Sequence, residues 1–472
     1  MNLKSIALWM GPLAFFVVKG VGPELGWSPE AASVLAAAAW ILIWWISEAA
    51  PIAVTSLLPI VLFPLTGVVS LKETTALYGS HYVFLFMGGF LVAIALERVQ
   101  LHRRLALMLL ARVGTRPDRI ILGFMLGTAL LSMWISNTAT TLMMLPIAMS
   151  VIRSLDVPHK GFAQALLLGT AYAANIGGMS TLVGTPPNIA MAGLLAEQHN
   201  VSIGFLEWFK LTGPLALILL ALTFFMLTRL LFPIRKIRLD AGATWIEEAL
   251  KGCGTWRTEE KRVLVVFSAL AIAWMSRKML VDLSGWPLSD TGIAMMAGIA
   301  LFLIPESRTS KRRLLEWEDT AGLPWNILLL FGGGLALAEG LSRAGILEAL
   351  VNELGTSGPS GQILLVSLIF IALALFLTEV MSNLALTVVM VPVVAALALQ
   401  FGAPAWSLAI PITWASSCAF MLPMATPPNA IVFGSQLIPM SSMARTGLLL
   451  NILAVVIIFV WTSGILPYFS FS

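Results

Sequence analysis

Long apolar runs recur along almost the whole chain, and they restrict it to a membrane fold. They lie near residues 6–22, 31–49, 52–70, 80–97, 120–152, 163–196, 211–232, 263–281, 288–304, 324–342, 361–398, 405–435 and 446–468. A spanning helix needs ~20 such residues. Because a bilayer satisfies no free backbone groups, the chain must pair its own, which helices do within one segment. The sequence therefore predicts an all-α polytopic membrane protein.

Composition excludes several other classes. Charged residues make up 11% of the chain and hydrophobic ones 58%, whereas soluble domains carry about 25% charged residues. The two cysteines, Cys253 and Cys418, are too few for a disulfide framework, and their spacing suggests no metal site. The net charge of +4 comes from basic loops, so no nucleic-acid partner is expected. The first apolar run follows Lys4 without a cleavage site, and we interpret it as a retained helix.

Two polar triplets interrupt apolar runs at matched places, Ser136-Asn137-Thr138 and Ser382-Asn383-Leu384. Some forty residues after each triplet comes a second polar break, Gly-Thr-Pro-Pro-Asn at 184–188 and Ala-Thr-Pro-Pro-Asn at 425–429. The offset between halves is 246 residues for the triplets and 241 for the Pro-Pro-Asn breaks. Such paired breaks inside apolar segments are typical of secondary transporters built from repeats with broken helices.

The spacing predicts two repeats, residues 1–232 and 263–472, joined by a polar cytoplasmic linker at 233–262. Each repeat contains a re-entrant hairpin with the triplet at its tip, followed by a broken helix. The hairpins are expected at 120–152 and 361–398 and the broken helices at 163–196 and 405–435. Basic residues 98–119 predict an amphipathic helix at the membrane surface, and a short amphipathic piece covers 343–354.

Lysine and arginine placement gives the orientation. With the N-terminus inside, about eleven spans and two hairpins, 22 of the 28 basic residues are cytoplasmic. The C-terminus is then outside. Residues 98–119 fall inside and 343–354 outside, so the two repeats are inverted, which is the topology expected of alternating access.

The breaks have a chemistry that suits ions. The N-terminal end of a helix carries partial positive charge and favours an anion's oxygens. Freed carbonyls and the Ser, Thr and Asn oxygens suit a bare Na⁺. Neither triplet and neither Pro-Pro break contains Asp, Glu, Lys, Arg or His, which favours an anion with accompanying cations over a proton relay. The alternative is that small polar residues serve helix packing, but the duplication of triplet and break favours binding.

Four segments, in this order, carry a family resemblance: SMWISNTATTLMMLP at 132–146, VGTPPN at 183–188, TEVMSN at 378–383 and MLPMATPPNAIVFG at 421–434. They resemble the divalent anion/sodium symporter family of di- and tricarboxylate and sulfate transporters, and the likeness covers essentially the whole chain. It implies a homodimer with scaffold helices up to about 119 and 354. It also implies an elevator, in which the hairpins and broken helices form a transport domain that moves across the membrane.

The resemblance also implies the ligands. One sodium site would use Ser132, Ser136, Asn137 and the backbone at Gly184. The other would use Thr378, Asn383 and the backbone at Met381 and Ala425. The anion would contact Asn137, Thr138, Thr185, Ser382, Asn383, Thr426 and Pro427. The second triplet departs from the family pattern, because Leu384 stands where a threonine is usual; either the anion site loses a hydroxyl there, or residue 384 packs inside the hairpin.

The function expected on these grounds is sodium-coupled import of a divalent anion, with C4-dicarboxylates such as succinate, malate or fumarate as the first candidates. The alternatives are sodium-independent dicarboxylate exchange, and sulfate or a tricarboxylate as the substrate. An enzyme is not expected, since the apolar segments show no nucleophile, metal cluster or paired acids. No cofactor besides Na⁺ is expected. The resemblance places the protein in a bacterial inner membrane.

Overall fold

The structure is a computed structural model that describes residues 3–114, 116–153, 160–232, 234, 244–308, 310–346, 349 and 361–471. Over these residues the regular elements are helices, and strand-like pairing is confined to an isolated antiparallel bridge between Pro305 and Arg313. The predicted all-α membrane fold is confirmed at this level. Parts of the predicted linker, 233 and 235–243, and most of the segment 343–354 lie outside the described residues.

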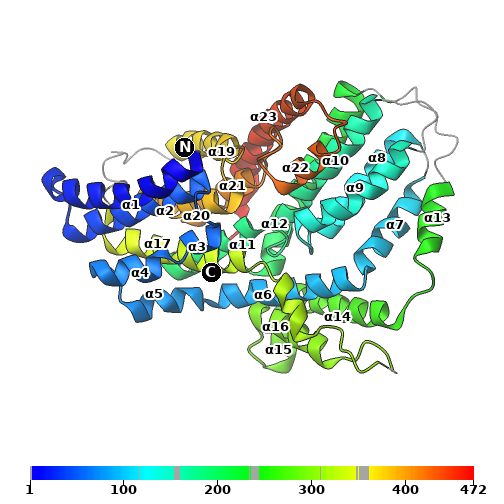
Figure 1. Ribbon diagram of the computed structural model, residues 1–472, viewed down its shortest axis with the longest axis horizontal. Helices are drawn as coiled ribbons and strands as arrows, with labels where there is room; N and C mark the ends of the chain where they lie inside the picture. Colours follow the sequence, from blue (N-terminus) through cyan, green and yellow to red (C-terminus); the bar gives the residue numbers. More distant parts are fainter. Residues whose placement is uncertain are drawn as a thin grey trace.

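The N-terminal helices begin in dark blue at the left of Figure 1 and run toward its right side. They are α1 (Leu3–Val21), η1 (Gly22–Leu25), α2 (Pro29–Ser47), α3 (Ile52–Thr55), α4 (Leu58–Thr66), α5 (Leu71–Tyr78), α6 (His81–Arg98) and α7 (Leu101–Val113). The predicted apolar segment 52–70 is divided into two short helices, α3 and α4. Pro59 lies in the first turn of α4, and its missing N–H prevents α3 from continuing through it. Gly67, with φ of 74°, ends α4.

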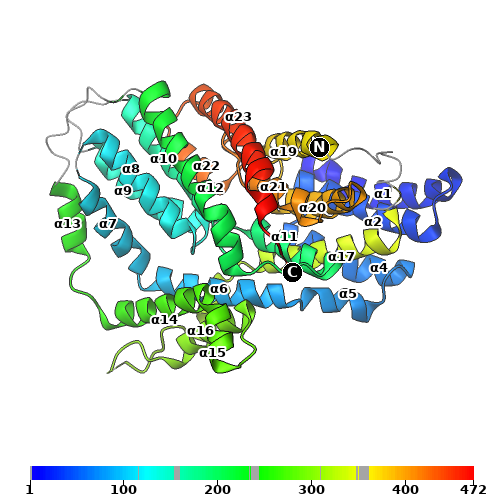
Figure 2. The same ribbon diagram turned by 180° about the vertical axis from the view of Figure 1, so that it is seen from behind.

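The next helices bring the first triplet into a turn. They are α8 (Pro117–Ser132), α9 (Asn137–Arg153), α10 (Lys160–Met179) and α11 (Pro186–His199). Residues 133–136, here called the first turn, join α8 to α9, and these two helices lie side by side in both views (Figures 1 and 2). Residues 180–185, the first break, separate α10 from α11. Pro186 begins α11, where a missing N–H costs nothing.

The middle of the chain folds back along the molecule. Its helices are α12 (Phe205–Phe225), the π-helical η2 (Met226–Leu231), α13 (Thr244–Gly252), α14 (Thr258–Met275), α15 (Arg277–Ser284), α16 (Asp290–Leu303), η3 (Trp317–Gly322) and α17 (Trp325–Arg343). The predicted linker 233–262 therefore contains α13 and the start of α14. Helices α14 and α15 meet at an angle of 80°.

The second triplet also lies where one helix ends and another begins. The C-terminal helices are α19 (Gly361–Leu377), α20 (Asn383–Gln400), α21 (Trp406–Ser416), α22 (Pro427–Phe433), α23 (Met440–Gly464) and η4 (Leu466–Tyr468). Residues 378–382 form the second turn and residues 417–426 the second break, which contains the buried Cys418. Helix α22 packs against α9 and α10, and α20 packs against α11. The two parts of the chain are thus interlocked around the turns and breaks.

Seven helices in the described residues are long and apolar enough to cross a membrane, or eight if the bent pair α14–α15 is one span. The sequence predicts about eleven. Four of the eleven predicted spans are interrupted or short, whereas α20, which lies in the predicted hairpin 361–398, is among the helices long enough to cross. Residues 52–66 are split into α3 and α4, the predicted broken helices are each divided in two, and α16 has 14 residues. At 1.5 Å per residue, α16 is roughly 21 Å long.

A buried arginine fastens α7 to the segment before α14. Arg104 and Glu260 are 4% and 2% exposed, and their side chains approach to 3.1 Å. The guanidinium also donates to the carbonyls of Cys253 (2.7 Å), Gly254 (2.9 Å) and Thr255 (3.2 Å). Helix α7 is rich in arginine, as expected of a surface helix. Arg104 is nevertheless buried, and all three of its guanidinium nitrogens donate hydrogen bonds. We call this group the Arg104 clamp.

Among the described residues, seven ion pairs join segments that are distant in the sequence, and they can be compared with the predicted sides of the membrane. They are Lys4–Glu48, Arg98–Asp319, Arg104–Glu260, Arg229–Asp118, Arg277–Asp290, Lys278–Glu207 and Arg343–Glu73. In the predicted topology, both members of each pair lie on the same side of the membrane. The first four pairs fall on the side assigned to the cytoplasm and the last three on the other. Apart from the buried Arg104–Glu260 pair, such pairs near the surface add little stability, but they restrict which segments share a face.

Candidate functional site

The first turn is built around a contact between Ser132 and Asn137. The Ser132 hydroxyl, at the end of α8, lies 2.5 Å from Asn137 Oδ1 and 2.8 Å from the Ala174 carbonyl of α10. Asn137 begins α9, so one hydroxyl joins the helix before the turn, the helix after it and the neighbouring broken helix. Ser132 is completely buried. The arrangement gathers hydroxyl, carboxamide and carbonyl oxygens and brings no formal charge to them.

The second turn repeats this contact with Thr378 and Asn383. Thr378 Oγ1 lies 2.7 Å from Asn383 Oδ1 and 2.7 Å from the Ser416 carbonyl at the end of α21. Thr387, one helical turn into α20, lies 2.7 Å from the Ser416 hydroxyl. Residues 378 and 383 stand 246 positions after 132 and 137, the offset of the two triplets. The structure therefore brings Ser132 together with Asn137 and Thr378 together with Asn383, two members of each sodium site that the resemblance implies.

Gly178 makes room for the Asn137 side chain, and the sequence analysis did not find it. A Cβ atom at Gly178 would lie 2.5 Å from Asn137 Oδ1, a distance that real Cβ contacts do not show. A Cβ atom at the neighbouring Gly177 would lie even closer to another atom, 2.4 Å from the Ala129 carbonyl oxygen of α8. The glycine pair just before the first break, at 177–178, was the available signal, because paired glycines mark close backbone approach.

The asparagine of each Pro-Pro-Asn motif holds its own break together. Asn188 Nδ2 donates to the carbonyls of Thr181 (2.7 Å) and Met179 (3.1 Å). Asn429 Nδ2 donates in the same way to Leu422 and Ala419, both at 3.1 Å. Both asparagines are completely buried. Each motif thus supplies a donor for carbonyls that the interrupted helix leaves without their usual partner.

Asn175 connects the two parts of the chain directly. From α10 it donates through Nδ2 to the Ala419 carbonyl and to Thr426 Oγ1, both at 3.2 Å. Thr426 is a predicted anion ligand in the second break, while the carbonyl of Ala174, next to Asn175, accepts a hydrogen bond from Ser132, just before the first turn. Two neighbouring residues of α10 therefore contact the two regions: Ala174 contacts the residue before the first turn, and Asn175 contacts the second break. Single-sequence reasoning had no signal for this contact, which joins residues 251 positions apart.

The remaining predicted ligands lie at the helix starts. Ser136 is exposed and accepts from Ala139 N (3.2 Å), and Gly184 N donates to Thr181 Oγ1 (3.0 Å). Thr185 and Ser382 precede α11 and α20, but neither side chain caps its own helix. Both hydroxyls are therefore available to another partner. Thr138, Met381 and Ser382 are half-buried, Ala425 and Thr426 are buried, and Pro427 is exposed.

Leu384 is packed inside the protein. Its side chain is 6% exposed and belongs to the hydrophobic core, whereas the matched Thr138 is half-buried. This burial favours the packing interpretation over loss of an anion ligand.

Leu384→Thr is therefore expected to lower stability by about 1–3 kcal/mol, because a hydroxyl replaces buried methyl groups. Thermal unfolding in detergent and the apparent affinity for succinate would measure the two effects separately. An unchanged affinity with a lower unfolding temperature is the expected result. A tighter affinity would show instead that residue 384 faces the anion.

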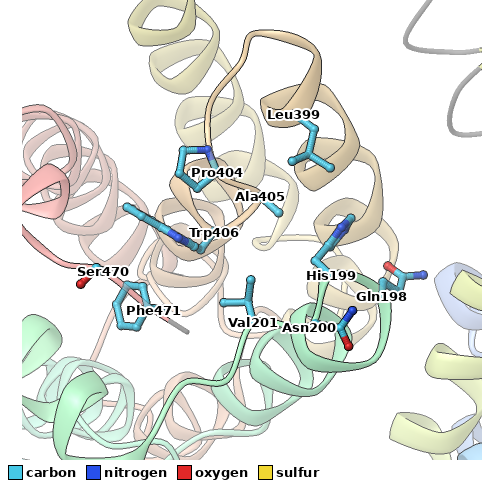
Figure 3. A pocket seen from close by; sticks show the side chains of 10 residues that line it. All are labelled: Gln198, His199, Asn200, Val201, Leu399, Pro404, Ala405, Trp406, Ser470 and Phe471. Carbon is cyan, nitrogen blue, oxygen red and sulfur yellow. The ribbon is translucent and has the colours of Figure 1, made fainter.

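A cavity of about 640 Å³ lies away from both turns (Figure 3). It is lined by the end of α11, the end of α20, the start of α21 and residues near the C-terminus, including His199, Trp406 and Phe471. Burial lowers the pKa of the His199 imidazole. None of the predicted sodium or anion ligands is among the described residues that line it. A second cavity, of about 300 Å³, reaches the first turn at Trp134 and Ile135.

Glu379 is the charged residue that the sequence analysis missed. It follows Thr378 in the second turn, is 3% exposed, and accepts hydrogen bonds from the backbone of the second break. An acidic residue inside an apolar run is a functional signal in membrane proteins, and this one lies within the segment TEVMSN. It was overlooked because it stands outside the triplet itself.

Comparison with known proteins agrees with this geometry. The family described as "Sodium:sulfate symporter transmembrane region" matches residues 4–466. The chain is 39% identical over 469 residues to the sodium-dependent dicarboxylate transporter SdcS of Staphylococcus saprophyticus, covering 96% of this chain and 90% of that protein. It is 38% identical over 480 residues to SdcS of Staphylococcus aureus strain USA300, covering 98% and 91%. With its paired turns and breaks in an all-helical membrane fold, the chain belongs to the divalent anion/sodium symporter family.

Proposed function

We propose that this protein is a sodium-coupled symporter that imports C4-dicarboxylates such as succinate, malate or fumarate. The observation that carries the proposal is the duplicated contact of Ser132 with Asn137 and of Thr378 with Asn383, each beside a broken helix. The names of the relatives, sodium-dependent dicarboxylate transporters, support both the coupling ion and the substrate class.

Sodium would bind at each turn. The first site takes oxygens from Ser132, Ser136 and Asn137 and the backbone of Gly184. The second takes oxygens from Thr378 and Asn383 and the backbone of Met381 and Ala425. Hard cations prefer oxygen ligands, and the side chains at both turns supply them without formal charge. The short Ser132–Asn137 and Thr378–Asn383 contacts support this assignment, because oxygens that already lie close need little rearrangement to surround an ion.

The dicarboxylate would lie between the two turns and the two breaks. Its contacts would be Asn137, Thr138, Thr185, Ser382, Asn383, Thr426 and Pro427. Helices α11 and α22 begin at Pro186 and Pro427, and the partial positive charge of helix N-termini favours carboxylate oxygens. The contact of Asn175 with Thr426 supports a shared site, because it holds the second break beside the first turn.

The rest of the family architecture belongs to the same proposal. Repeats at 1–232 and 263–472 would be inverted, with scaffold helices holding a homodimer and the turns and breaks moving as an elevator. Helices α8 and α9, with 16 and 17 residues, are roughly 24–26 Å long and fall short of the ~30 Å hydrocarbon core, which supports a re-entrant hairpin. The matching sides of the ion pairs support the proposed topology, with the N-terminus inside and the C-terminus outside.

Uptake of labelled succinate into liposomes containing the purified protein tests the function. An inward Na⁺ gradient is expected to drive saturable accumulation that rises cooperatively with Na⁺ concentration. Equal uptake with choline in place of Na⁺ would contradict sodium coupling and favour dicarboxylate exchange, which requires dicarboxylate inside the vesicle.

Competition in the same vesicles tests the substrate. Unlabelled malate and fumarate are expected to inhibit succinate uptake at much lower concentrations than sulfate or citrate. Stronger inhibition by sulfate or citrate would assign the site to that anion and contradict the dicarboxylate proposal.

A further inference from the structure

Glu379 lies in the second turn, and its carboxylate accepts hydrogen bonds from the second break and from α23. It directly follows Thr378, whose hydroxyl contacts Asn383, and its side chain is 3% exposed. A buried carboxylate without compensation is very costly. Across the part of the chain that the structure describes, no lysine or arginine forms an ion pair with Glu379. Its stabilisation must come from neutral groups.

Four donors surround this carboxylate. Oε1 accepts from the backbone N–H groups of Phe420 (2.7 Å) and Met421 (2.9 Å) and from Asn451 Nδ2 of α23 (2.8 Å). Oε2 accepts from Leu422 N (3.0 Å). All of these groups donate, so they match an ionised carboxylate, which only accepts. Such charge-assisted bonds are roughly twice as strong as neutral ones. The side chain thus ties the second turn, the second break and α23 together.

The held segment 420–422 is itself part of the second break's framework. Asn429 of the Pro-Pro-Asn motif donates to the Leu422 carbonyl (3.1 Å), so one peptide segment is bound by Glu379 through its N–H groups and by Asn429 through its carbonyl. On its other side, a Cβ atom at Gly447 of α23 would overlap Phe420 O and Met421 Cα. The position of the break relative to Thr378 therefore depends on Glu379.

The first turn has no counterpart of this carboxylate. Met133 stands at the matched position, 246 residues earlier. At the first turn the corresponding hydrogen bond is uncharged: the Thr181 side chain of the break donates through Oγ1 to the backbone carbonyl of Met133 in the turn (2.6 Å). The second turn therefore contains a buried carboxylate on the residue after Thr378, and the first turn has an uncharged methionine at the matched position.

We propose that Glu379 is a positioning residue that makes the two sodium sites unequal. It fixes the second break against Thr378 and Asn383, and its charge raises sodium affinity at the second site above that at the first. This inference rests on the proposed sodium-coupled function. It predicts that sodium fills the second site at lower concentration, before the neutral first site is occupied.

Sodium binding without substrate tests the proposal in the full-length protein. The readout is thermal stabilisation in detergent as NaCl replaces choline chloride at constant ionic strength. In Glu379→Gln, which keeps the shape and removes the charge, the sodium concentration for half-maximal stabilisation is expected to rise at least tenfold. Glu260→Gln is the matched control, because Glu260 is an equally buried carboxylate in the Arg104 clamp. It is expected to lower the unfolding temperature and leave the sodium midpoint unchanged.

Asn451→Ala is the second variant, and it decides the question if Glu379→Gln does not fold. It removes one donor and keeps the charge, so a shift of about threefold in the sodium midpoint is expected. A midpoint that stays within twofold of wild type in the variants that fold would overturn the proposal, even if they are less stable. Failure of the proposed function looks different, because the wild-type protein itself would then show neither sodium stabilisation nor sodium-driven uptake.

Discussion

Asn137→Ala is expected to raise the sodium concentration needed for half-maximal succinate uptake by about 10- to 150-fold. Its carboxamide oxygen meets the Ser132 hydroxyl at 2.5 Å beside the α10 backbone, and in the proposed site it is a ligand of a desolvated cation. Hydrogen bonds to charged groups are worth ~1.5–3 kcal/mol, and we take this as the scale for losing one ligand. With about 1.4 kcal/mol per factor of ten, the expected range follows. The measurement is the sodium activation curve of uptake into liposomes.

Asn383→Ala is expected to act in the same direction, because Asn383 occupies the matched place beside Thr378. Asn326→Ala serves as the control, since Asn326 is exposed at the start of α17 and touches neither turn. The sodium requirement is expected to rise at least as much as the apparent affinity for succinate falls. An unchanged sodium curve with weakened succinate affinity would show that the asparagines bind only the anion.

Arg104→Met is expected to destabilise the protein by about 3–5 kcal/mol. The substitution would leave Glu260 as a buried, uncompensated charge, a change that costs about this much. It would also remove the donor for the carbonyls of Cys253, Gly254 and Thr255. Unfolding of the purified variant in detergent would measure the loss. Arg103→Met is the control, because Arg103 is its exposed neighbour and surface substitutions usually change stability by less than about 0.5 kcal/mol.

The double variant Arg104→Met with Glu260→Met separates charge from packing. Replacing both partners removes the unpaired charge, so the double variant is expected to be more stable than Arg104→Met alone. If the double variant were as unstable as the sum of the two single variants, the ion pair would contribute nothing of its own. The loss would then come from the three carbonyl contacts and the Trp256 ring, over which Arg104 lies at 5.1 Å.

The sequence predicted the positions of the turns and breaks well, because the residues that interrupt a membrane helix are themselves distinctive. Asn137 and Asn383 each begin a helix, and Pro186 and Pro427 do so too. Proline and small polar residues act locally, through a missing N–H or a competing side chain, so one sequence reveals them. The Ser132–Asn137 and Thr378–Asn383 contacts span five positions each, and the family resemblance assigns the two members of each contact to one sodium site.

Contacts between distant segments could not be predicted in this way. Glu379 binds the backbone 41–43 positions later, and any residue offers such N–H groups, so no sequence pattern marks the partner. Asn175 reaches Thr426 only because α22 packs against α10. The split of 52–70 was missed for a different reason, because apolar composition alone does not show where a short helix ends.

One of the two cysteines of the chain lies in the second break, where its thiol can serve as a chemical probe. Both thiols are free; Cys418 is completely buried in the second break, and Cys253 is half-buried beside the Arg104 clamp. In Cys253→Ser, Cys418 is the sole thiol, so the rate at which a water-soluble maleimide modifies it reports how often the second break opens to water. Sodium is expected to slow that labelling. The rate at which the second break becomes accessible to water can thus be measured without introducing a new cysteine.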